Sequence, residues 1–270
     1  MPDPTDAALA EALRPLTDHP ERAAIFCDID GVLAPIVGRA EDAKVPEEVS
    51  VQLSRIGRRY GLVACVSGRS ASEARRLVGV GSINYAGSHG AELLETGSTE
   101  SRMIPEFKNW EGRISGFAGD HDTPELRGLR VRIEDKGPIV AFHWREAPDA
   151  DAALERLKAL ANEAEGAGLA THWGRKVLEV RPPVKIGKDQ AVRDLIGSHD
   201  VSAALFGGDD TTDLDAFAAL GELVEAGELD SVVRVGVRSD EGPPEIVERA
   251  DVVVDGVGGF ARVLSKLAEA

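Results

Sequence analysis

The sequence predicts an α/β fold in which a parallel sheet is interrupted by a smaller α+β domain. In the first and last thirds of the chain, short apolar runs alternate with helical patterns, which is typical of strands buried on both faces of a parallel sheet. Between them, from about residue 104 to residue 183, apolar and polar residues alternate, which is typical of an antiparallel sheet with one open face. We therefore expect a core domain formed by residues 1–103 and 184–270, with residues 104–183 as an inserted domain.

The core is expected to contain a series of buried strands. They are the apolar runs at residues 23–27, 62–66, 203–206, 232–237 and 252–254. Between the first two runs, Val49, Leu53 and Ile56 keep helical spacing, and Ser70 with Glu73 forms a capping-box pattern ahead of another helix. Because strands that alternate with helices are joined by right-handed crossovers, these elements predict a parallel sheet.

The inserted domain is expected to contain two strands, a helix over roughly residues 149–165, and two further strands. In its first strand, Leu129, Val131 and Ile133 share one face, because alternate residues of a strand point to the same side. The same alternation turns further apolar residues inward in the later strands, namely Val140, Phe142, Trp144, Leu178 and Val180. The opposite side, which we call the polar face, carries Glu134, His143, Arg145 and Glu179. From the pattern alone it is either solvated sheet surface or a binding surface.

Composition narrows the class of partner and the compartment. The 270 residues include 47 acidic and 31 basic side chains, and the formal charge of −16 repels nucleic acid and anionic membrane and favours small molecules. No apolar run approaches the roughly 18 to 20 residues of a membrane span, and the acidic start lacks a signal-peptide layout, so we expect a cytoplasmic protein. Cys27 and Cys65 lie in buried-strand patterns and are predicted to be reduced core thiols. The oligomeric state stays open.

Chemically distinctive residues follow three of the predicted strands. The first strand runs into DIDG, the second into SGR, and the third into GGDDTTD. Asp28 and Asp30 are alternate residues, so their carboxylates face one small volume and repel each other unless a proton or a cation lies between them. Ligands of open parallel sheets bind beyond the carboxyl ends of the strands, and Lys188 opens the helix before the third strand. Several carboxylates, a hydroxyl and a lysine at one edge indicate a site for Mg²⁺ and phosphate.

The motifs also permit simpler interpretations than a shared site. An EF-hand calcium loop starting at Asp28 is excluded, because Val32 and Arg39 stand where the loop needs an acid or amide and a glutamate. Each tripeptide alone could be a simple strand-to-helix turn. Four such motifs at consecutive positions of one topology favour a single shared site.

The four motifs resemble those of a known group. DIDGVL, VSGR, the lysine of IGKDQA and GGDDTTD are similar, in order, to the motifs of the haloacid dehalogenase superfamily of phosphohydrolases. YAGSHGAE, IEDKGPIVAFHWR, KVLEVRPP and GDDTTDLDAF resemble the trehalose-6-phosphate phosphatases within it. The resemblance covers both domains. It implies a parallel-sheet, Rossmann-like haloacid dehalogenase core with an inserted α+β cap domain, and Mg²⁺-dependent hydrolysis of trehalose 6-phosphate through an aspartyl phosphate.

The residues and the resemblance together assign catalytic roles. Asp28 is the predicted nucleophile, and Asp30 is the predicted general acid for the leaving sugar oxygen and then the base for water. The metal is expected to be held by Asp28, by the backbone carbonyl of Asp30 and by Asp209, with Asp210 and Asp213 supporting the metal shell.

The remaining predicted site residues bind the substrate. Ser67 and Lys188 are expected to hold phosphoryl oxygens and to act with the catalytic aspartates. The resemblance implies further substrate-binding residues, which are Gly68, Arg69, His89, Glu134, Lys136, His143, Arg145 and Glu179. The polar face of the inserted domain would then bind the sugar.

Three alternatives to this function stay open at this point. The core motifs permit a phosphatase of another sugar phosphate, such as sucrose phosphate or a glycosyl phosphate, equally well. A phosphosugar mutase is less favoured, because the few cations of the inserted domain are interleaved with acids and no dedicated second phosphate site is evident. A catalytically inactive binding protein is disfavoured because no motif residue is missing.

Overall fold

The computed structural model describes residues 3–39, 42–137, 139–184, 186–239 and 242–269. By its internal contacts the chain divides into two compact units. The core unit consists of Met1–Arg102 and Ile186–Ala270, and the inserted unit consists of Met103–Lys185. Among the described residues, no helix is both long enough and apolar enough to cross a bilayer.

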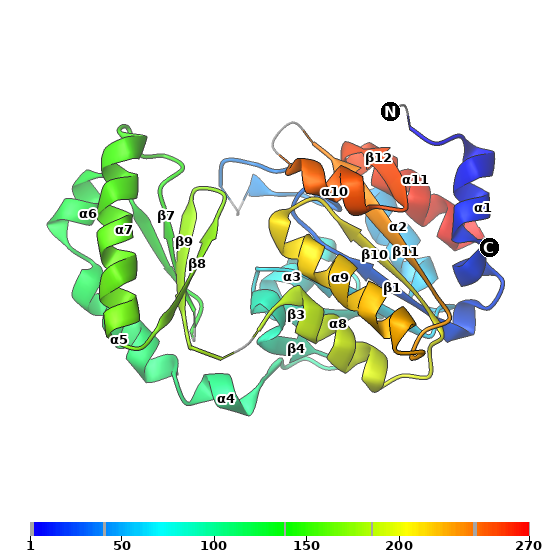
Figure 1. Ribbon diagram of the computed structural model, residues 1–270, viewed down its shortest axis with the longest axis horizontal. Helices are drawn as coiled ribbons and strands as arrows, with labels where there is room; N and C mark the ends of the chain where they lie inside the picture. The colour runs from blue at the N-terminus through cyan, green and yellow to red at the C-terminus, as the bar shows by residue number, and fades with distance from the viewer. Residues whose placement is uncertain (1–2, 40–41, 138, 185, 240–241, 270) are drawn as a thin grey trace. The chain divides into compact units, whose positions relative to one another are not determined.

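The core unit is built on an eight-stranded sheet with the strand order β12-β11-β10-β1-β2-β3-β4-β5 (Figure 1). Its parallel strands are β1 (Ala23–Cys27), β2 (Leu62–Val66), β3 (Asn84–Gly87), β10 (Ala203–Gly208), β11 (Ser231–Arg238) and β12 (Val252–Asp255). β4 (Glu92–Leu94) runs antiparallel to β3, and β5 (Arg102–Met103) ends the sheet. The expected strands are all present, whereas β3, β4 and β5 had no expected counterpart because they are too short to form a clear apolar run.

Helices cover both faces of this sheet. They are α1 (Asp6–Thr17), α2 (Glu47–Ile56), α3 (Ala71–Val78), α8 (Lys188–Gly197), α9 (Thr211–Glu225), α10 (Pro244–Arg249) and α11 (Gly256–Glu269), with short 3-10 turns η1 (Pro20–Arg22) and η3 (Ser88–Gly90). One face packs against α1, α2, α3 and α11, and the other against α8, α9 and α10. Figure 1 shows α8, α9 and α10 lying together across that second face.

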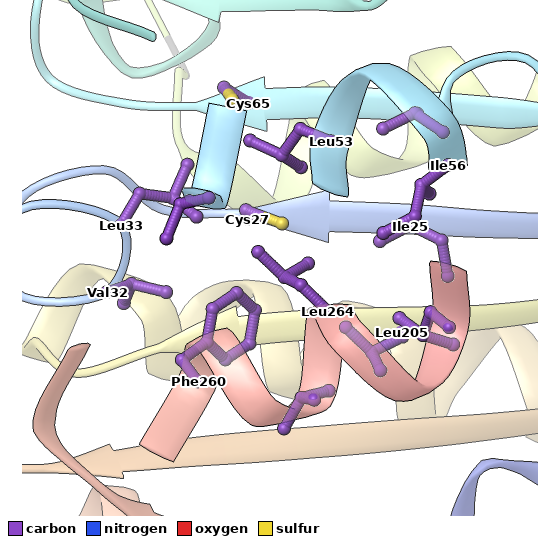
Figure 2. Packing of buried hydrophobic residues seen from close by; sticks show 14 of the residues in the cluster. Ile25, Cys27, Val32, Leu33, Leu53, Ile56, Cys65, Leu205, Phe260 and Leu264 are labelled. Atoms are coloured by element: carbon purple, nitrogen blue, oxygen red, sulfur yellow. The ribbon is translucent and has the colours of Figure 1, made fainter. Parts of the chain in front are cut away.

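Alternation along β1 explains why its whole sequence is apolar. Ile25 and Cys27 belong to the core on the α2 and α11 side, whereas Ala24 and Phe26 belong to the core on the α8 and α9 side. Figure 2 shows side chains of α2 and α11, among them Leu264, gathered around Ile25 and Cys27. A strand covered on both faces has no solvent-facing position, so no residue of the run is polar.

The two cysteines behave as the sequence predicts. Cys27 and Cys65 are free, buried thiols on neighbouring strands. Burial raises the pKa of both thiols, and nearby ionisable groups raise it further. They are therefore unreactive packing residues rather than nucleophiles.

The inserted unit contains a four-stranded antiparallel sheet with the order β6-β7-β9-β8. Its strands are β6 (Arg132–Asp135), β7 (Val140–His143), β8 (Ala170–Gly174) and β9 (Val177–Arg181), and its helices are α4 (Pro105–Lys108), α5 (Glu111–His121), α6 (Pro124–Gly128) and α7 (Ala150–Gly166). The long helix α7 packs its Leu157 and Leu160 into one core with Phe142 and Leu178 of the sheet. The predicted inward residues Val140, Trp144 and Val180 belong to the same core.

Two features of the inserted unit differ from expectation. The first strand begins at Arg132 rather than at Leu129, because Leu129 closes α6 and Arg130 has a left-handed φ of 55° that breaks the alternation. Helices α4, α5 and α6 were not predicted. In α5 the segment EGRISGFAGDH carries three glycines, which weaken helix propensity and leave only Ile114 and Ala118 as a buried stripe.

Candidate active site

Strand register brings the predicted catalytic residues of the core unit to one edge of the sheet. Cys27 at the end of β1 lies opposite Cys65 of β2 and Gly207 of β10. Asp28, Ser67 and Asp209 follow these three positions within one or two residues, so the parallel strands deliver them to the same edge. All three side chains are buried.

Three carboxylates meet at this edge. Oxygen atoms of Asp28, Asp209 and Asp213 lie within 4.8 Å of one another, and within the described part of the chain this is the one group of three side chains placed so that they could hold a metal ion. Gly31 makes the arrangement possible, because its φ is 99° and a Cβ at this position would collide with the Asp209 carboxylate. The glycine of DIDG is thus required both by backbone conformation and by space.

Lys188 places a positive charge against two of these carboxylates. Its Nζ lies 2.9 Å from Oδ1 of Asp28 and 2.6 Å from Oδ1 of Asp213. Burial lowers the pKa of Lys188, but the charges of Asp213 and Asp28 outweigh burial and leave the pKa raised, so the lysine is a cation. Burial raises the pKa of Asp28 well above its usual value, Lys188 opposes this, and Asp213 and Asp209 add to it.

Asp213 has both of its oxygens occupied by the protein. Oδ1 accepts from Lys188, and Oδ2 accepts from the backbone N–H groups of Asp209 and Asp210, each at 2.9 Å. Asp210 is the N-cap of α9, and its side chain accepts from the N–H of Thr211 at 2.6 Å. The sequence GDDTTD therefore forms a capping box that holds Asp209 and Lys188 in place. The side chain of Asp210, predicted to support the metal shell, lies outside the three-carboxylate group found among the described residues; Asp30 was predicted to contribute its backbone carbonyl, which this group of side chains does not test.

Arg69 lies against Asp30. Its Nε donates to Oδ2 of Asp30 at 2.7 Å and its Nη2 donates to Oδ1 at 2.6 Å, which is the bidentate geometry that favours an ionised carboxylate. The Arg69 side chain is 11% exposed and that of Asp30 is 37% exposed, so solvent reaches this pair from the Asp30 side. The sequence placed Arg69 at the substrate, and the structure adds its contact with the predicted general acid.

His89 lies in the core unit beside the SGR motif. The position that a Cβ of Gly68 would occupy is 2.7 Å from Nε2 of His89, so the imidazole packs directly over this glycine. Sequence reasoning missed a neighbour, the buried Glu92, which is bonded to Ser88. A glutamate next to apolar residues in the stretch AELL was the available signal.

The predicted sugar-binding residues lie in the inserted unit, most of them on the polar face of its sheet. Glu134 and Glu179 both lie beside Ala141, on opposite sides of β7. Oε2 of Glu134 accepts from Nε2 of His143 at 2.8 Å, and Lys136 Nζ lies 3.7 Å from Oε1 of Glu179. Arg145 lies beyond the end of β7 and is exposed, so strand alternation does not place it on this face.

The polar face has a distinct electrostatic character. The hydrogen bond with His143, opposed by burial and aided by Lys136, lowers the pKa of Glu134 to about 2. Glu179 is 5% exposed, so a carboxylate is buried beside an ammonium on a sheet face that could have been fully solvated. Paired polar groups of this kind can form directed hydrogen bonds with a hydroxylated ligand.

Comparison with solved structures shows the structural class to which this fold belongs. A haloacid dehalogenase-like hydrolase from Bacteroides thetaiotaomicron matches it with a TM-score of 0.62 at 14% identity, over 90% of this chain and 98% of the other. At this identity the likeness shows the fold alone. The predicted fold class, a haloacid dehalogenase core with an inserted α+β domain, is confirmed.

Closer relatives define the family. A family model described as trehalose-phosphatase matches residues 26–243. A protein of Sinorhizobium fredii described as "Probable trehalose-phosphate phosphatase" is 31% identical over 232 residues, 81% of this chain and 82% of that protein. The C-terminal domain of trehalose-6-phosphate phosphatase from C. albicans has a TM-score of 0.77 at 20% identity, over 99% of this chain and 98% of that one. The chain belongs to the trehalose-phosphatase family, as its motifs predict, and it spans between 15% and 82% of the length of curated relatives that it matches.

Proposed function

We propose that this chain is a Mg²⁺-dependent phosphatase that hydrolyses trehalose 6-phosphate to trehalose and inorganic phosphate. Family membership supports the reaction and the substrate. The observation that carries the proposal in the structure is the buried group of Asp28, Asp209 and Asp213 around Lys188. It combines a nucleophile, a metal site and a phosphate-binding cation at one strand edge.

The charges of this group fit a divalent cation. Three buried carboxylates and one ammonium leave an excess of two negative charges, and uncompensated buried charge is costly. The raised pKa of Asp28 has the same origin, because burial and neighbouring carboxylates disfavour its ionised form. Asp28 and Asp209 offer the hard oxygen ligands that Mg²⁺ prefers. The bound ion would supply the positive charge that lets an anionic nucleophile approach an anionic phosphate.

The side chains divide the two half-reactions between them. An oxygen of Asp28 attacks phosphorus as the bond from phosphorus to the sugar oxygen breaks, and Asp30 gives that oxygen a proton. Asp30 then takes a proton from water, which attacks the aspartyl phosphate and releases inorganic phosphate. Arg69 donates to both oxygens of Asp30 and so fixes the orientation of this side chain. Ser67 and Lys188 hold phosphoryl oxygens through both steps.

We further propose that the inserted unit recognises the sugar. The paired side chains of its polar face, Glu134 with His143 and Lys136 with Glu179, support this role, together with Arg145 at the end of β7. Carboxylates that bond sugar hydroxyls select strongly against analogues that lack them, because the buried polar group is then left without a partner.

Phosphate release from trehalose 6-phosphate, measured beside sucrose 6-phosphate and beside isomerisation of hexose phosphates, tests the proposal. We expect hydrolysis of trehalose 6-phosphate with the highest kcat/KM, no isomerisation, and loss of activity in chelator that Mg²⁺ restores and Ca²⁺ does not. Faster hydrolysis of another sugar phosphate would identify that compound, and not trehalose 6-phosphate, as the substrate. Isomerisation would indicate a mutase. Full activity in excess chelator would show that the reaction does not depend on a metal ion.

A further inference from the structure

We propose that Glu92 is a positioning residue that holds the phosphate-binding turn Ser67–Arg69 through the neighbouring turn Ser88–Gly90. Glu92 begins β4, where it is 7% exposed; it is the last residue of the stretch YAGSHGAE but is not one of the predicted site residues. The inference rests on the proposed function only in taking Ser67 and Lys188 as groups that hold phosphate.

The carboxylate of Glu92 connects two segments that flank the site. Its Oε1 accepts from the hydroxyl of Ser88 at 2.6 Å, and its Oε2 accepts from the backbone N–H of Ala71 at 3.3 Å. Ala71 is the first residue of α3 and is separated from the SGR motif only by the N-cap Ser70. Glu92 therefore joins the beginning of α3 to the Ser88–Gly90 turn, and both oxygens are used.

The Ser88–Gly90 turn has a backbone conformation that needs support. Ser88 and His89 have φ angles of 49° and 56°, a left-handed region that residues with a Cβ adopt at a cost. Ser88 is fully buried, so its hydroxyl needs a partner inside the protein. The hydrogen bond to Glu92 is that partner.

The same turn is bonded to the phosphate-binding turn along its backbone. The N–H of Ser88 donates to the carbonyl of Arg69 at 2.7 Å, and the N–H of His89 donates to the carbonyl of Ser67 at 3.0 Å. The His89 ring packs over Gly68 between these two bonds. The turn also contacts α8, the helix that Lys188 opens. Loss of the Glu92 carboxylate should thus disturb the positions of Ser67 and Arg69 first, without removing any group that touches phosphate.

Binding of inorganic phosphate in the presence of Mg²⁺, measured by calorimetry, tests this role without reference to the sugar. In Glu92→Ala we expect phosphate to bind about tenfold more weakly, because a charged hydrogen-bond acceptor is lost from a buried network. The kcat/KM for an aryl phosphate should fall by a similar factor. Glu92→Gln should stay within about threefold of wild type, because its amide can accept from Ala71 and donate to the Ser88 hydroxyl.

Asn84→Ala is the matched control. Asn84 is also a buried polar residue, and its side chain hydrogen-bonds with Val63 of β2 and with Thr96. It begins β3, whereas the Ser88–Gly90 turn follows the other end of that strand. This variant should lose thermal stability and keep the wild-type phosphate affinity. A Glu92→Ala protein that behaves in the same way, less stable but with unchanged phosphate binding, would overturn the proposal.

Ser88→Ala keeps the experiment decisive if Glu92→Ala does not fold. It removes the hydroxyl bond and leaves the bond between Glu92 and Ala71 intact. We expect phosphate affinity to fall by about threefold, less than for Glu92→Ala. Wild-type affinity in Ser88→Ala would count against the proposal. A wild-type protein that binds phosphate but does not hydrolyse trehalose 6-phosphate would contradict the proposed substrate and leave this inference standing.

Discussion

At the scale of single residues, the buried Asp28 has to be both ionised and close to other carboxylates. Asp209 and Asp213 lie in the same group, and Lys188 is the cation that contacts it. Burial and these carboxylates raise the pKa of Asp28, so its charged form is costly without a further cation. The proposed nucleophile and the proposed metal site therefore belong to one electrostatic unit.

Asp28→Asn should abolish turnover and should not destabilise the protein. The amide keeps the size of the side chain but cannot attack phosphorus, so we expect less than about one hundredth of the wild-type kcat. Since the folded-state pKa of Asp28 is raised, its ionisation opposes folding at neutral pH in chelator, and the neutral amide removes this cost. The melting temperature in chelator should equal or exceed that of wild type. Retention of a tenth of the wild-type activity would refute the assignment of Asp28 as the nucleophile.

Gly31→Ala should weaken metal binding. A Cβ at Gly31 would collide with the Asp209 carboxylate, so the variant must move a predicted metal ligand. We expect the Mg²⁺ concentration for half-maximal activity to rise by about tenfold or more. Gly227→Ala is the control, because Gly227 also has a left-handed φ, 74°, but a Cβ there meets nothing within 4 Å.

Both glycine variants should lose stability on the order of 1 kcal/mol from backbone strain. Only Gly31→Ala should change the Mg²⁺ requirement. An identical Mg²⁺ dependence in Gly31→Ala and Gly227→Ala would show that Asp209 does not hold the metal.

At the scale of elements, the sheet of the inserted unit has one apolar face, which packs against the core beneath α7, and one polar face. Leu178 and Val180 of β9 enter the core beneath α7, whereas Glu179 between them lies on the polar face. Side chains of β6 and β7 meet on that face through Glu134 and His143. The polar face thus contributes to the stability of the unit as well as to its surface chemistry.

The Glu134 and His143 pair predicts a defined pH dependence of stability. The folded-state pKa of Glu134 is about 2, below its ordinary value of 4.5, so the pair stabilises the fold fully above about pH 4.5 and loses this contribution as pH falls toward 2. Urea unfolding of wild type and Glu134→Gln at several pH values measures it. The stability difference between the two proteins should shrink steadily over that window.

The matched control is Glu155→Gln on α7, whose carboxylate pairs with Lys158 at the surface and is 72% exposed. Its difference from wild type should be small and independent of pH, as exposed pairs contribute little. A constant difference for Glu134→Gln over the same range would mean that the ionised carboxylate does not stabilise the fold.

At the scale of the whole molecule, the two units are proposed to divide the work between phosphoryl transfer and sugar recognition. Glu179→Gln and His143→Ala should then reduce kcat/KM for trehalose 6-phosphate by about 10- to 150-fold, because hydrogen bonds to charged groups contribute roughly 1.5 to 3 kcal/mol. An aryl phosphate has no sugar, so its hydrolysis should change by less than about threefold. Glutamine is chosen because it keeps the size of the buried Glu179 side chain and an oxygen that can accept from Lys136.

Ser67→Ala and Lys188→Ala are the comparison variants. Every phosphate monoester uses the contacts of these residues, so both substrates should be impaired together. Steady-state kinetics of all four variants with both substrates checks the division. Equal losses for the two substrates in Glu179→Gln would assign that residue to the stability of its unit rather than to the sugar.

Much of this organisation is local, and the sequence alone determined it. Runs such as AAIFC have no polar position because both faces of the strand are covered, so a contiguous pattern is enough to recognise them. The general rule for parallel strands then brings Asp28, Ser67 and Asp209 to one edge. The family followed from the same motifs, since they carry the chemistry.

Only the tertiary structure decided which polar groups are partners. The turn into α9 forms the capping box, which directs Asp213 to Lys188 and keeps Asp210 outside the carboxylate group. The contact between Arg69 and Asp30 joins residues that are 39 positions apart in the sequence. The role inferred for Glu92 depends on two left-handed residues that no apolar pattern reveals. The periodic pattern of apolar residues indicates which residues close in sequence face the same environment. Hydrogen bonds between distant residues are set by strand register, turn conformation and side-chain direction, and these exist only once the chain has folded.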